Sequence, residues 1–325
     1  MSFQAGLPYY VVATAPSMDG YASNGAAMIM GNMKVTYNAH VPEVIIGDTD
    51  ILSQAPMEMI QAGYGDILGK YSCLNDWKLS HVVNEEYFCP EVYQLTYDML
   101  LKTRDLGGKL QERDGEAIKT LMEALVGVGI AMAYVGNSRP ASDSEHHLSH
   151  FFEVVGLLND EPYLPHGIDV AYSAVYTQRL REQLLADKMR NKEMTEKTEQ
   201  LPENSAHAEK YCFPWGKWEE KIKKVYGKAA DGVIALQRKL DWYSVDRRGI
   251  YREKWDEIQE ILKEVPSSTE LTGYLNSVGL NLEQFEQLYG EKKIADAIKY
   301  AKDLKDRYSI LWMYYDFLFA VSHTL

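Results

Sequence analysis

The sequence predicts a mainly α-helical protein with a small β-containing segment at its N-terminus. From residue 56 onward, apolar residues recur with helical spacing in almost every segment. The first fifty residues differ, because they contain short Val-, Ile- and Tyr-rich runs bounded by Pro, Gly and Asp. The chain has 325 residues and is 46% hydrophobic, which is enough for one large domain or two ordinary ones.

Two short runs in the N-terminal segment have the composition of strands. They are YYVVATAP at 9–16 and EVIIGD at 43–48. The stretch between them, SMDGYASNGAAMIMGN at 17–32, is rich in Gly, Ser and Asn and predicts a loop. Two or three strands cannot bury both faces alone, so we expect a partner sheet or a helical layer. The change of pattern divides the chain into 1–54 and 55–325.

The helices are predicted in order from the apolar spacing. The first follows Pro56, a residue that suits a first helical turn. The helices expected before residue 189 cover 57–83, 90–104, 114–136, 142–158 and 166–188. The polar stretch at about 189–210 predicts a surface excursion or linker. The helices expected after it cover 218–243, 252–265, 281–290 and 291–321, and Ser267 is expected to be an N-cap.

Composition excludes several classes of function. The net charge is −13 and no Lys/Arg cluster is present, which argues against a nucleic-acid-binding surface and fits a cytoplasmic protein. Cys73, Cys89 and Cys212 are far apart, so neither a disulfide framework nor a thiolate metal site is expected. The apolar run 124–135 is too short to span a bilayer and predicts a buried helix. No signal peptide and no membrane insertion are therefore expected.

The stretch SEHHLSH holds three of the eight histidines. On the helix predicted there, His146 and His150 lie four residues apart on one face, a spacing that lets two imidazoles bind one metal ion. His147 points elsewhere. A third ligand must come from another element, and Asp66 and His166 are the two candidates. The same spacing also occurs on ordinary polar helix faces, so it does not decide for a metal site by itself.

The stretch GYGDILG, at 63–69, is close to a dinucleotide-binding fingerprint. No strand leads into it, because the helix predicted from Pro56 already contains it. Its glycines are therefore expected to permit close helix packing around Asp66. A carboxylate in a buried helix needs a cation or hydrogen-bond donors to offset its desolvation.

Four motifs together resemble a known family. TAPSMDGYAS, AGYGDILGKYSCLNDWKLS, SRPASDSEHHLSH and PHG are similar, in this order, to motifs of sn-glycerol-1-phosphate dehydrogenases. These enzymes belong to the iron-containing alcohol dehydrogenase and dehydroquinate synthase-like superfamily. The resemblance covers residues 7 to about 180 and the last helix. It implies the C-terminal helical domain of that fold at 55–325, behind an α/β remnant of the dinucleotide-binding domain at 1–54.

The resemblance also implies an activity and residue roles. The activity is reduction of dihydroxyacetone phosphate to sn-glycerol 1-phosphate with NADH or NADPH, a step of phospholipid metabolism, at a divalent zinc, nickel or iron ion. The implied metal ligands are Asp66, His146 and His166. The implied substrate contacts are Asp19, Asp66 and His150, of which Asp19 and His150 are catalytic. The implied cofactor contacts are Thr14, Ser17 and Ser23. Lys70 and Arg139 carry charges suited to phosphate, but both are expected to be surface residues.

The chain departs from this family in two respects. Family members carry roughly a hundred more residues upstream, which form most of the cofactor domain, so we expect impaired activity and leave open whether Met1 is the true start. Asp143 stands where the family usually has Gly. A metal-dependent hydrolase and a non-catalytic binding protein are the alternatives. The expected partner is a phosphorylated triose, with a second copy of the chain as an open alternative.

Overall fold

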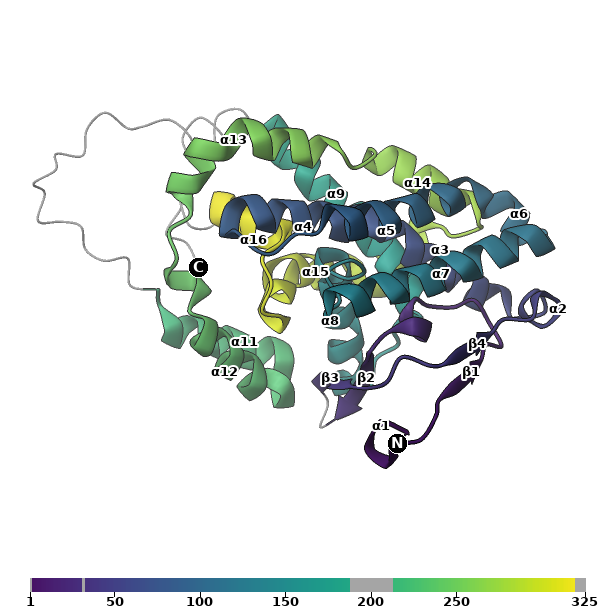
Figure 1. Ribbon diagram of the computed structural model, residues 1–325. Helices are drawn as coiled ribbons and strands as arrows, with labels where there is room; N and C mark the ends of the chain where they lie inside the picture. Colours follow the sequence, from purple (N-terminus) through teal and green to yellow (C-terminus); the bar gives the residue numbers. More distant parts are fainter. Residues whose placement is uncertain (1, 31–32, 188–212, 319–325) are drawn as a thin grey trace, which may run out of the picture.

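The computed structural model describes residues 2–30, 33–187 and 213–318, and it has a helical body with a small β layer along one edge (Figure 1). The described strands all lie between residues 10 and 46, and helices dominate the remainder. The predicted mainly α fold class is therefore confirmed. The expected excursion at 189–210 and Cys212 lie outside the described residues.

The β layer consists of two separate strand pairs. Strands β1 (Tyr10–Val12) and β4 (Val44–Ile46) are parallel neighbours, and they confirm the two predicted strands. Strands β2 (Gly25–Met30) and β3 (Met33–Asn38) form an antiparallel pair. The loop predicted at 17–32 was therefore wrong over β2. Its Gly, Ala and Met residues have weak strand preference, and pairing with β3 supplies the stabilisation that local composition does not indicate.

The first predicted helix of the body is divided. It begins at Met57 after Pro56, as expected, but α3 (Met57–Leu68) ends before Gly69 and α4 (Lys70–Asn84) begins after it. The other long helices in this half agree with the prediction within a few residues. They are α5 (Pro90–Thr103), α7 (Gly115–Val135), α8 (Ser144–Asn159) and α9 (His166–Ala186). The short elements are α1 (Ser2–Ala5), η1 (Gly20–Ala22), α2 (Thr49–Leu52), η2 (Arg104–Leu106) and α6 (Gly107–Gln111).

The C-terminal half contains shorter helices than predicted. The helix expected at 218–243 is broken at Gly227, whose φ of +47° lies in the left-handed region. Ser267 is the N-cap of α14 and forms a capping box with Glu270, so this prediction is confirmed. The boundary predicted between the helices 281–290 and 291–321 is confirmed by the non-helical backbone of Gly290, which kinks α15, but the second helix is interrupted after Tyr300. The elements are α11 (Trp215–Tyr226), η3 (Gly227–Ala229), α12 (Ala230–Leu240), η4 (Trp242–Ser244), α13 (Arg248–Lys263), α14 (Ser268–Ser277), α15 (Leu282–Tyr300), η5 (Ala301–Leu304) and α16 (Ile310–Leu318).

Helix α7 contains the apolar run that was expected to be buried. It is the one helix among the described residues that is long and apolar enough to cross a membrane, and half of its most apolar stretch is buried by the rest of the protein. It packs against α5, η1 and α2. This pattern is typical of a core helix, as the sequence predicted.

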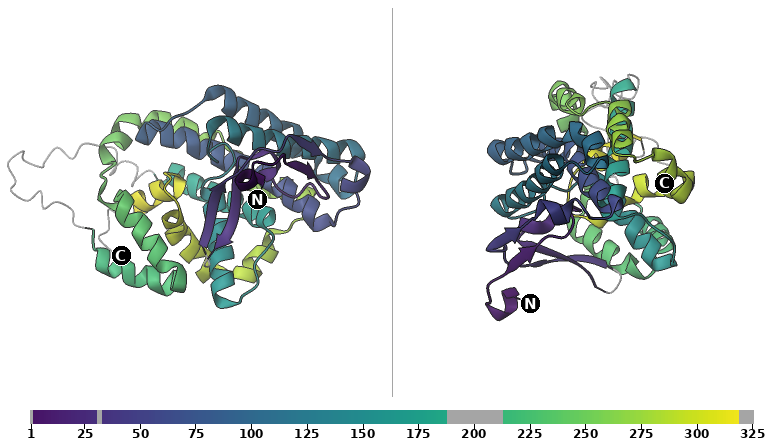
Figure 2. Two further views of the ribbon diagram at one scale, coloured as in Figure 1. Left: turned by 60° about the horizontal axis from the view of Figure 1, so that its bottom comes forward. Right: turned by 90° about the vertical axis from the view of Figure 1, so that its right-hand side faces the viewer.

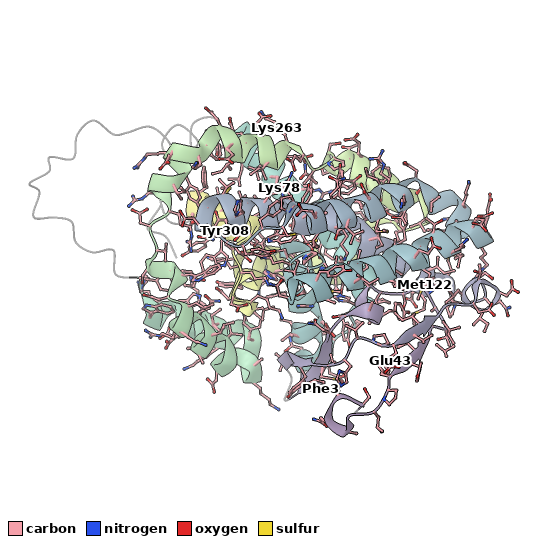
Figure 3. The ribbon with its side chains drawn as sticks, viewed as in Figure 1. Phe3, Glu43, Lys78, Met122, Lys263 and Tyr308 are labelled. Carbon is pink, nitrogen blue, oxygen red and sulfur yellow. The ribbon has the colours of Figure 1, made fainter. Side chains whose placement is uncertain are left out.

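The core positions the candidate site. Helix α9 packs along both α3 and α8 in the middle of the helical body. The β layer lies against one side of that body, and the hairpin β2–β3 contacts α8 through β3 (Figure 2). At the C-terminal end of the core, the hydroxyl of Tyr308 lies 2.7 Å from that of Tyr251, whereas Lys263 is exposed and Lys78 is half-buried (Figure 3).

Candidate metal and substrate site

Three histidine rings meet where α8 and α9 cross. His146 and His150 lie one turn apart on α8, and His166 is the first residue of α9. The ring centroids of His146 and His166 are 5.0 Å apart, those of His150 and His166 are 5.6 Å apart, and those of His146 and His150 are 6.0 Å apart. Oδ1 of Asp66, on α3, lies 3.5 Å from Nε2 of His146. Both candidates for the third ligand are therefore at the site.

Close packing of α3 on α9 allows Asp66 and His166 to meet. A Cβ atom on Gly65 would lie 2.5 Å from the carbonyl oxygen of Gly167, and one on Gly167 would lie 2.0 Å from the carbonyl oxygen of Ala62. Only glycine permits this approach of the two backbones. The prediction that the glycines around Asp66 serve helix packing is confirmed, and GYGDILG lies within α3 and the turn that follows it.

A carboxylate orients the ring of His146. Its Nδ1 lies 2.6 Å from Oε1 of Glu145. An ionised carboxylate can only accept, so Nδ1 donates and the neutral ring carries its lone pair on Nε2, towards Asp66. Burial lowers the pKa of His146, but the carboxylates of Asp66 and Glu145 more than compensate, so the net pKa is raised.

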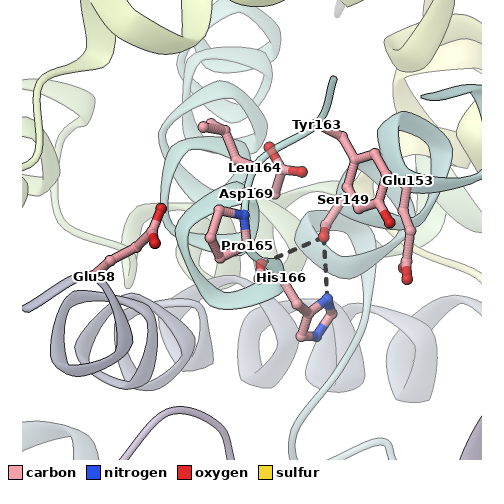
Figure 4. A pocket seen from close by; sticks show the side chains of 8 residues that line it. All are labelled: Glu58, Ser149, Glu153, Tyr163, Leu164, Pro165, His166 and Asp169. Atoms are coloured by element: carbon pink, nitrogen blue, oxygen red, sulfur yellow. Dashed lines mark hydrogen bonds between the residues drawn. The ribbon is translucent and has the colours of Figure 1, made fainter. Parts of the chain in front are cut away.

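A hydroxyl orients the ring of His166 in the same sense. Oγ of Ser149 lies 3.2 Å from Nδ1 of His166, and Figure 4 shows the ring turned with this nitrogen towards Ser149. Ser149 stands three residues after His146, in the same motif. The interaction occupies Nδ1, which assigns ligand binding to Nε2. His147, as expected, does not belong to this cluster; its ring is buried near Arg307 instead.

A buried lysine neutralises Asp66. Nζ of Lys70 lies 2.9 Å from Oδ1 of Asp66, 2.6 Å from Oδ2 of Asp19 and 2.8 Å from the carbonyl oxygen of Ala141. The backbone N–H of Asp19 also donates to Oδ2 of Asp66, at 3.1 Å. The expected need of Asp66 for a cation or donors is confirmed. The interpretation of Lys70 as a surface residue was wrong, because these three partners enclose its ammonium group.

The pKa values of these groups follow from their mutual contact. Burial raises the pKa of Asp66, but Lys70 and His146 together lower it by more, so the net pKa is well below the usual range. Burial lowers the pKa of Lys70, but Asp19 and Asp66 raise it more. For Asp19, burial and the neighbouring Asp66 outweigh Lys70, and its pKa is raised. Lys70 is therefore charged at neutral pH, and Asp66 is ionised.

Arg139 is also buried, so its interpretation as a surface residue was wrong. Its guanidinium group bonds the carboxylates of Glu86 and Asp143 and donates to the carbonyl oxygen of Tyr308 at 3.1 Å. Asp143, the departure from the family pattern, therefore pairs with Arg139 at the start of α8. The two carboxylates already compensate the charge that was considered for phosphate binding.

A cavity of about 430 Å³ opens beside His166 (Figure 4). Its lining residues are Glu58, Ser149, Glu153, Tyr163, Leu164, Pro165, His166 and Asp169. One ligand atom from each of His150, Glu153 and His166 lies within 4.8 Å of the others, so these residues form a second set that could hold a metal ion. The two candidate sets share His166. Asp66 and His146, which are more deeply buried, belong to the first set only.

The predicted cofactor residues lie on both sides of Asp19 in the sequence. Thr14 is exposed, and Ser17 and Ser23 are half-buried. Oγ of Ser23 accepts a hydrogen bond from the backbone of Gly25 at 3.0 Å. Their cofactor role stays a prediction. Sequence reasoning missed Glu145 and Ser149, although both are next to histidines in the motif that drew attention.

Comparison with known proteins gives consistent similarities. A family model described as iron-containing alcohol dehydrogenase matches residues 1–56. The chain is 38% identical over 188 residues to the glycerol-1-phosphate dehydrogenase [NAD(P)+] of Halalkalibacterium halodurans, which covers 56% of this chain and 47% of that protein. It is 40% identical over 200 residues to the glycerol-1-phosphate dehydrogenase [NAD(P)+] of Geobacillus thermodenitrificans, and the match covers 60% of this chain and 50% of that protein.

Coverage is larger for another relative. The enzyme of Geobacillus stearothermophilus is 35% identical over 252 residues, covering 76% of this chain and 62% of that protein. The chain spans about half the length of the first curated relatives that it matches. Among solved structures, an iron-containing alcohol dehydrogenase from Thermococcus thioreducens aligns with 95% of this chain and 64% of its own, at 14% identity and a TM-score of 0.49. The similarity to these dehydrogenases therefore rests on the sequence comparisons.

Proposed function

We propose that this chain belongs to the iron-containing alcohol dehydrogenase family and that it provides the metal- and substrate-binding part of an NAD(P)-dependent glycerol-1-phosphate dehydrogenase. The relatives that match at 35–40% identity carry that name. The proposed substrate is dihydroxyacetone phosphate, and the product is sn-glycerol 1-phosphate. The proposed location is the cytoplasm.

The proposed metal ligands are Asp66, His146 and His166. The observation that carries this choice is that Nδ1 is engaged in both rings, by Glu145 at 2.6 Å and by Ser149 at 3.2 Å. Histidines that bind metal ions usually hold their second nitrogen in this way. One carboxylate and two neutral imidazoles suit zinc, and also nickel or iron. The bound ion would supply Lewis-acid polarisation of the ketone oxygen.

The remaining site residues would act on the substrate. His150 shares the α8 face of His146 and lies beside His166, so its imidazole is placed to orient the substrate or to transfer a proton to the oxygen that becomes the alcohol. Asp19, held by Lys70, would accept a hydrogen bond from a substrate hydroxyl. Thr14, Ser17 and Ser23 would contact the nicotinamide cofactor, which supplies the hydride.

Metal content tests the ligand set. We expect the purified chain to hold one divalent ion. Asp66→Ala and His146→Ala should lose the ion, because each substitution removes one of the three proposed ligands. Glu153→Gln should retain the ion, since Glu153 belongs only to the second set. Retention by Asp66→Ala and His146→Ala together with loss by Glu153→Gln would place the ion among His150, Glu153 and His166 instead.

Turnover tests the reaction. We expect oxidation of NADH or NADPH that depends on dihydroxyacetone phosphate, measured in a version extended upstream of Met1, with the sn-1 phosphate as product. His150→Ala should keep the ion and lose turnover, because its role is on the substrate side. A version that binds the ion and never oxidises NAD(P)H with this ketone would contradict the proposed activity.

A further inference from the structure

We infer that Lys70 is an internal cation that competes with the divalent ion for Asp66 and holds the carboxylates of the site together when no ion is bound. This inference rests on the proposed metal site. It concerns a residue of α4 to which neither the residue pattern nor the family resemblance assigned a role at the metal.

The ammonium group of Lys70 donates hydrogen bonds to Asp66 and Ala141 and forms an ion pair with Asp19. It has three N–H groups, and it has three oxygen partners, on Asp66 at 2.9 Å, Asp19 at 2.6 Å and Ala141 at 2.8 Å. These partners come from α3, from the segment that follows β1 and from the loop that precedes α8. Lys70 therefore joins three segments that are distant in the sequence, with 0% of its surface exposed.

The ammonium group contacts the oxygen of Asp66 that faces the proposed ligand His146. Oδ1 of Asp66 is the atom that Lys70 contacts at 2.9 Å and the atom that lies 3.5 Å from Nε2 of His146. An ion bound by Asp66 and His146 would therefore lie close to the lysine charge. At short range in a buried site, such repulsion is weakly screened.

The balance of charge gives the direction of the effect. Two carboxylates, Asp19 and Asp66, contact one ammonium group, which compensates part of the negative charge of the ion-free cluster. Without that ammonium group, two buried carboxylates would face each other uncompensated, which destabilises the ion-free protein. A divalent ion would then relieve their repulsion and would meet no competing cation. A neutral residue at position 70 should therefore weaken the ion-free fold and tighten ion binding.

Titration with Co²⁺ tests this coupling, because bound Co²⁺ is followed by visible absorption without any need for turnover. We expect Lys70→Gln and Lys70→Met to lower the Kd for Co²⁺ by about tenfold or more in the metal-stripped chain. Lys70→Arg retains the charge and should stay within about threefold of the parent. The rise in Tm on adding Co²⁺ should also be larger in the neutral variants than in the parent.

Lys302 offers a matched control. It is equally buried and paired with a carboxylate, Asp303, but its neighbours are Tyr243 and Trp312 of the C-terminal core. Lys302→Met should leave the Kd for Co²⁺ unchanged even if it lowers Tm. Such a result separates loss of a lysine at the site from loss of a buried lysine in general.

Three outcomes overturn the inference in distinguishable ways. The competition would be refuted if both neutral variants bound Co²⁺ as well as the parent or more weakly. If the parent bound Co²⁺ and His146→Ala did not, the metal site itself would stand. Absence of Co²⁺ binding by the parent itself would refute the metal site and this inference together. If the neutral variants do not fold without an ion, refolding is compared with and without Co²⁺; we expect Co²⁺ to restore the fold, and failure to do so also overturns the inference.

Discussion

Glu145 and Ser149 select which ring nitrogen two histidines present at the site. Glu145 is fully buried, and its Oε1 also accepts the backbone N–H of Asp143 at 3.0 Å, so its position is fixed from two sides. Ser149 reaches His166 across the helix crossing. Both imidazoles are therefore oriented by protein groups.

This arrangement predicts the effect of Glu145→Gln. The amide oxygen can still accept from Nδ1 of His146, but the negative charge that raises the basicity of the ring is lost. We expect Zn²⁺ affinity to fall by about tenfold to a hundredfold, measured by competition with a chelator of known affinity. Glu153→Gln, two turns later on α8, is the control and should change the affinity little. The reverse order of the two effects would contradict the proposed ligand set.

Asp169 illustrates a carboxyl group that destabilises the fold as the pH rises. It is buried, and both its oxygens accept hydrogen bonds from the hydroxyl of Tyr289 at 2.9 Å. Burial raises the pKa of Asp169 well above 3.8, and the bond from Tyr289 lowers it only in part. The pKa of Asp169 is higher in the folded than in the unfolded protein. Its protonated form therefore contributes fully to stability below about pH 4, and this contribution is lost as the pH rises through the folded-state pKa.

Asp169→Asn should therefore gain stability relative to the parent as the pH rises. The amide can still accept the bond from Tyr289 and has no charge to desolvate. Above pH 4 the difference in the free energy of unfolding should grow in favour of the variant, to roughly 1 kcal/mol or more at pH 8. Urea unfolding at pH 5, 7 and 8 measures it. Asp231→Asn, at an exposed first-turn position of α12, is the control, and a pH-independent difference for Asp169→Asn would contradict the reasoning.

At the scale of elements, the crossing of α3 and α9 determines the distance between Asp66 and His166. Gly65→Ala would place a methyl group 2.5 Å from the carbonyl oxygen of Gly167, so the helices must separate. We expect a loss of about 1–3 kcal/mol in stability and weaker ion binding, because Asp66 and His166 move apart. Thermal unfolding with and without Zn²⁺ measures both effects.

Gly273→Ala is the matched control for that prediction. Gly273 lies within α14, and a Cβ atom there would meet open space. The added methyl group should stabilise the helix by about 0.5–1 kcal/mol and leave ion binding unchanged. If Gly65→Ala behaved in the same way, the close approach of the two backbones would not be what positions the ligands.

The elements also show what could be predicted from the sequence. Apolar spacing is a local property, so the helices from 57 to 186 were found nearly in place. The breaks at Gly69 and Gly227 were missed, because an isolated glycine within an apolar helical pattern is tolerated as often as it ends a helix, whereas the division at Gly290 was predicted. The strand β2 was missed because its stability comes from pairing with β3.

The residues of the site could be predicted where they belong to short sequence motifs. The histidine spacing on α8 is local, and the structure brings Asp66 and His166 to it. The burial of Lys70 and Arg139 was not predictable, because it also needs partners that are distant in the sequence, although Asp66 and Asp143 lie only four residues from them. Ala141 is 71 residues from Lys70, and Glu86 is 53 residues from Arg139. Nothing near a charged residue in the sequence states which partner the fold will supply.

At the scale of the whole molecule, the N-terminal segment combines a site residue with an open β surface. It carries Asp19 to the helices, yet the parallel pair β1–β4 leaves Tyr10, Val12, Val44 and Ile46 exposed. Parallel strands are ordinarily covered on both faces. We therefore expect the 325-residue chain to associate through this surface.

Val12→Thr combined with Ile46→Thr should raise the fraction of monomer, because it reduces the exposed apolar area and keeps β-branched residues in the strands. Light scattering coupled to size exclusion measures the change as a function of protein concentration. Tyr134→Thr, at an exposed position on α7, is the control for a general change in surface hydrophobicity. An equal effect of the control would mean that β1 and β4 are not the contact.

The same segment predicts weak cofactor binding by this 325-residue chain. Pyrophosphate groups are usually bound by the free N–H groups at the start of a helix that follows a strand. The described helix that follows β4 is α2, and its first N–H groups already donate to Asp48, at 2.9 and 3.4 Å. Thr14, Ser17 and Ser23 could hold only part of a dinucleotide. We therefore expect a Kd for NADH above about 100 µM and little turnover, because hydride transfer requires a closely held ring. Fluorescence titration with NADH measures the Kd, and micromolar binding with ordinary turnover would show that the first fifty residues form a sufficient cofactor site.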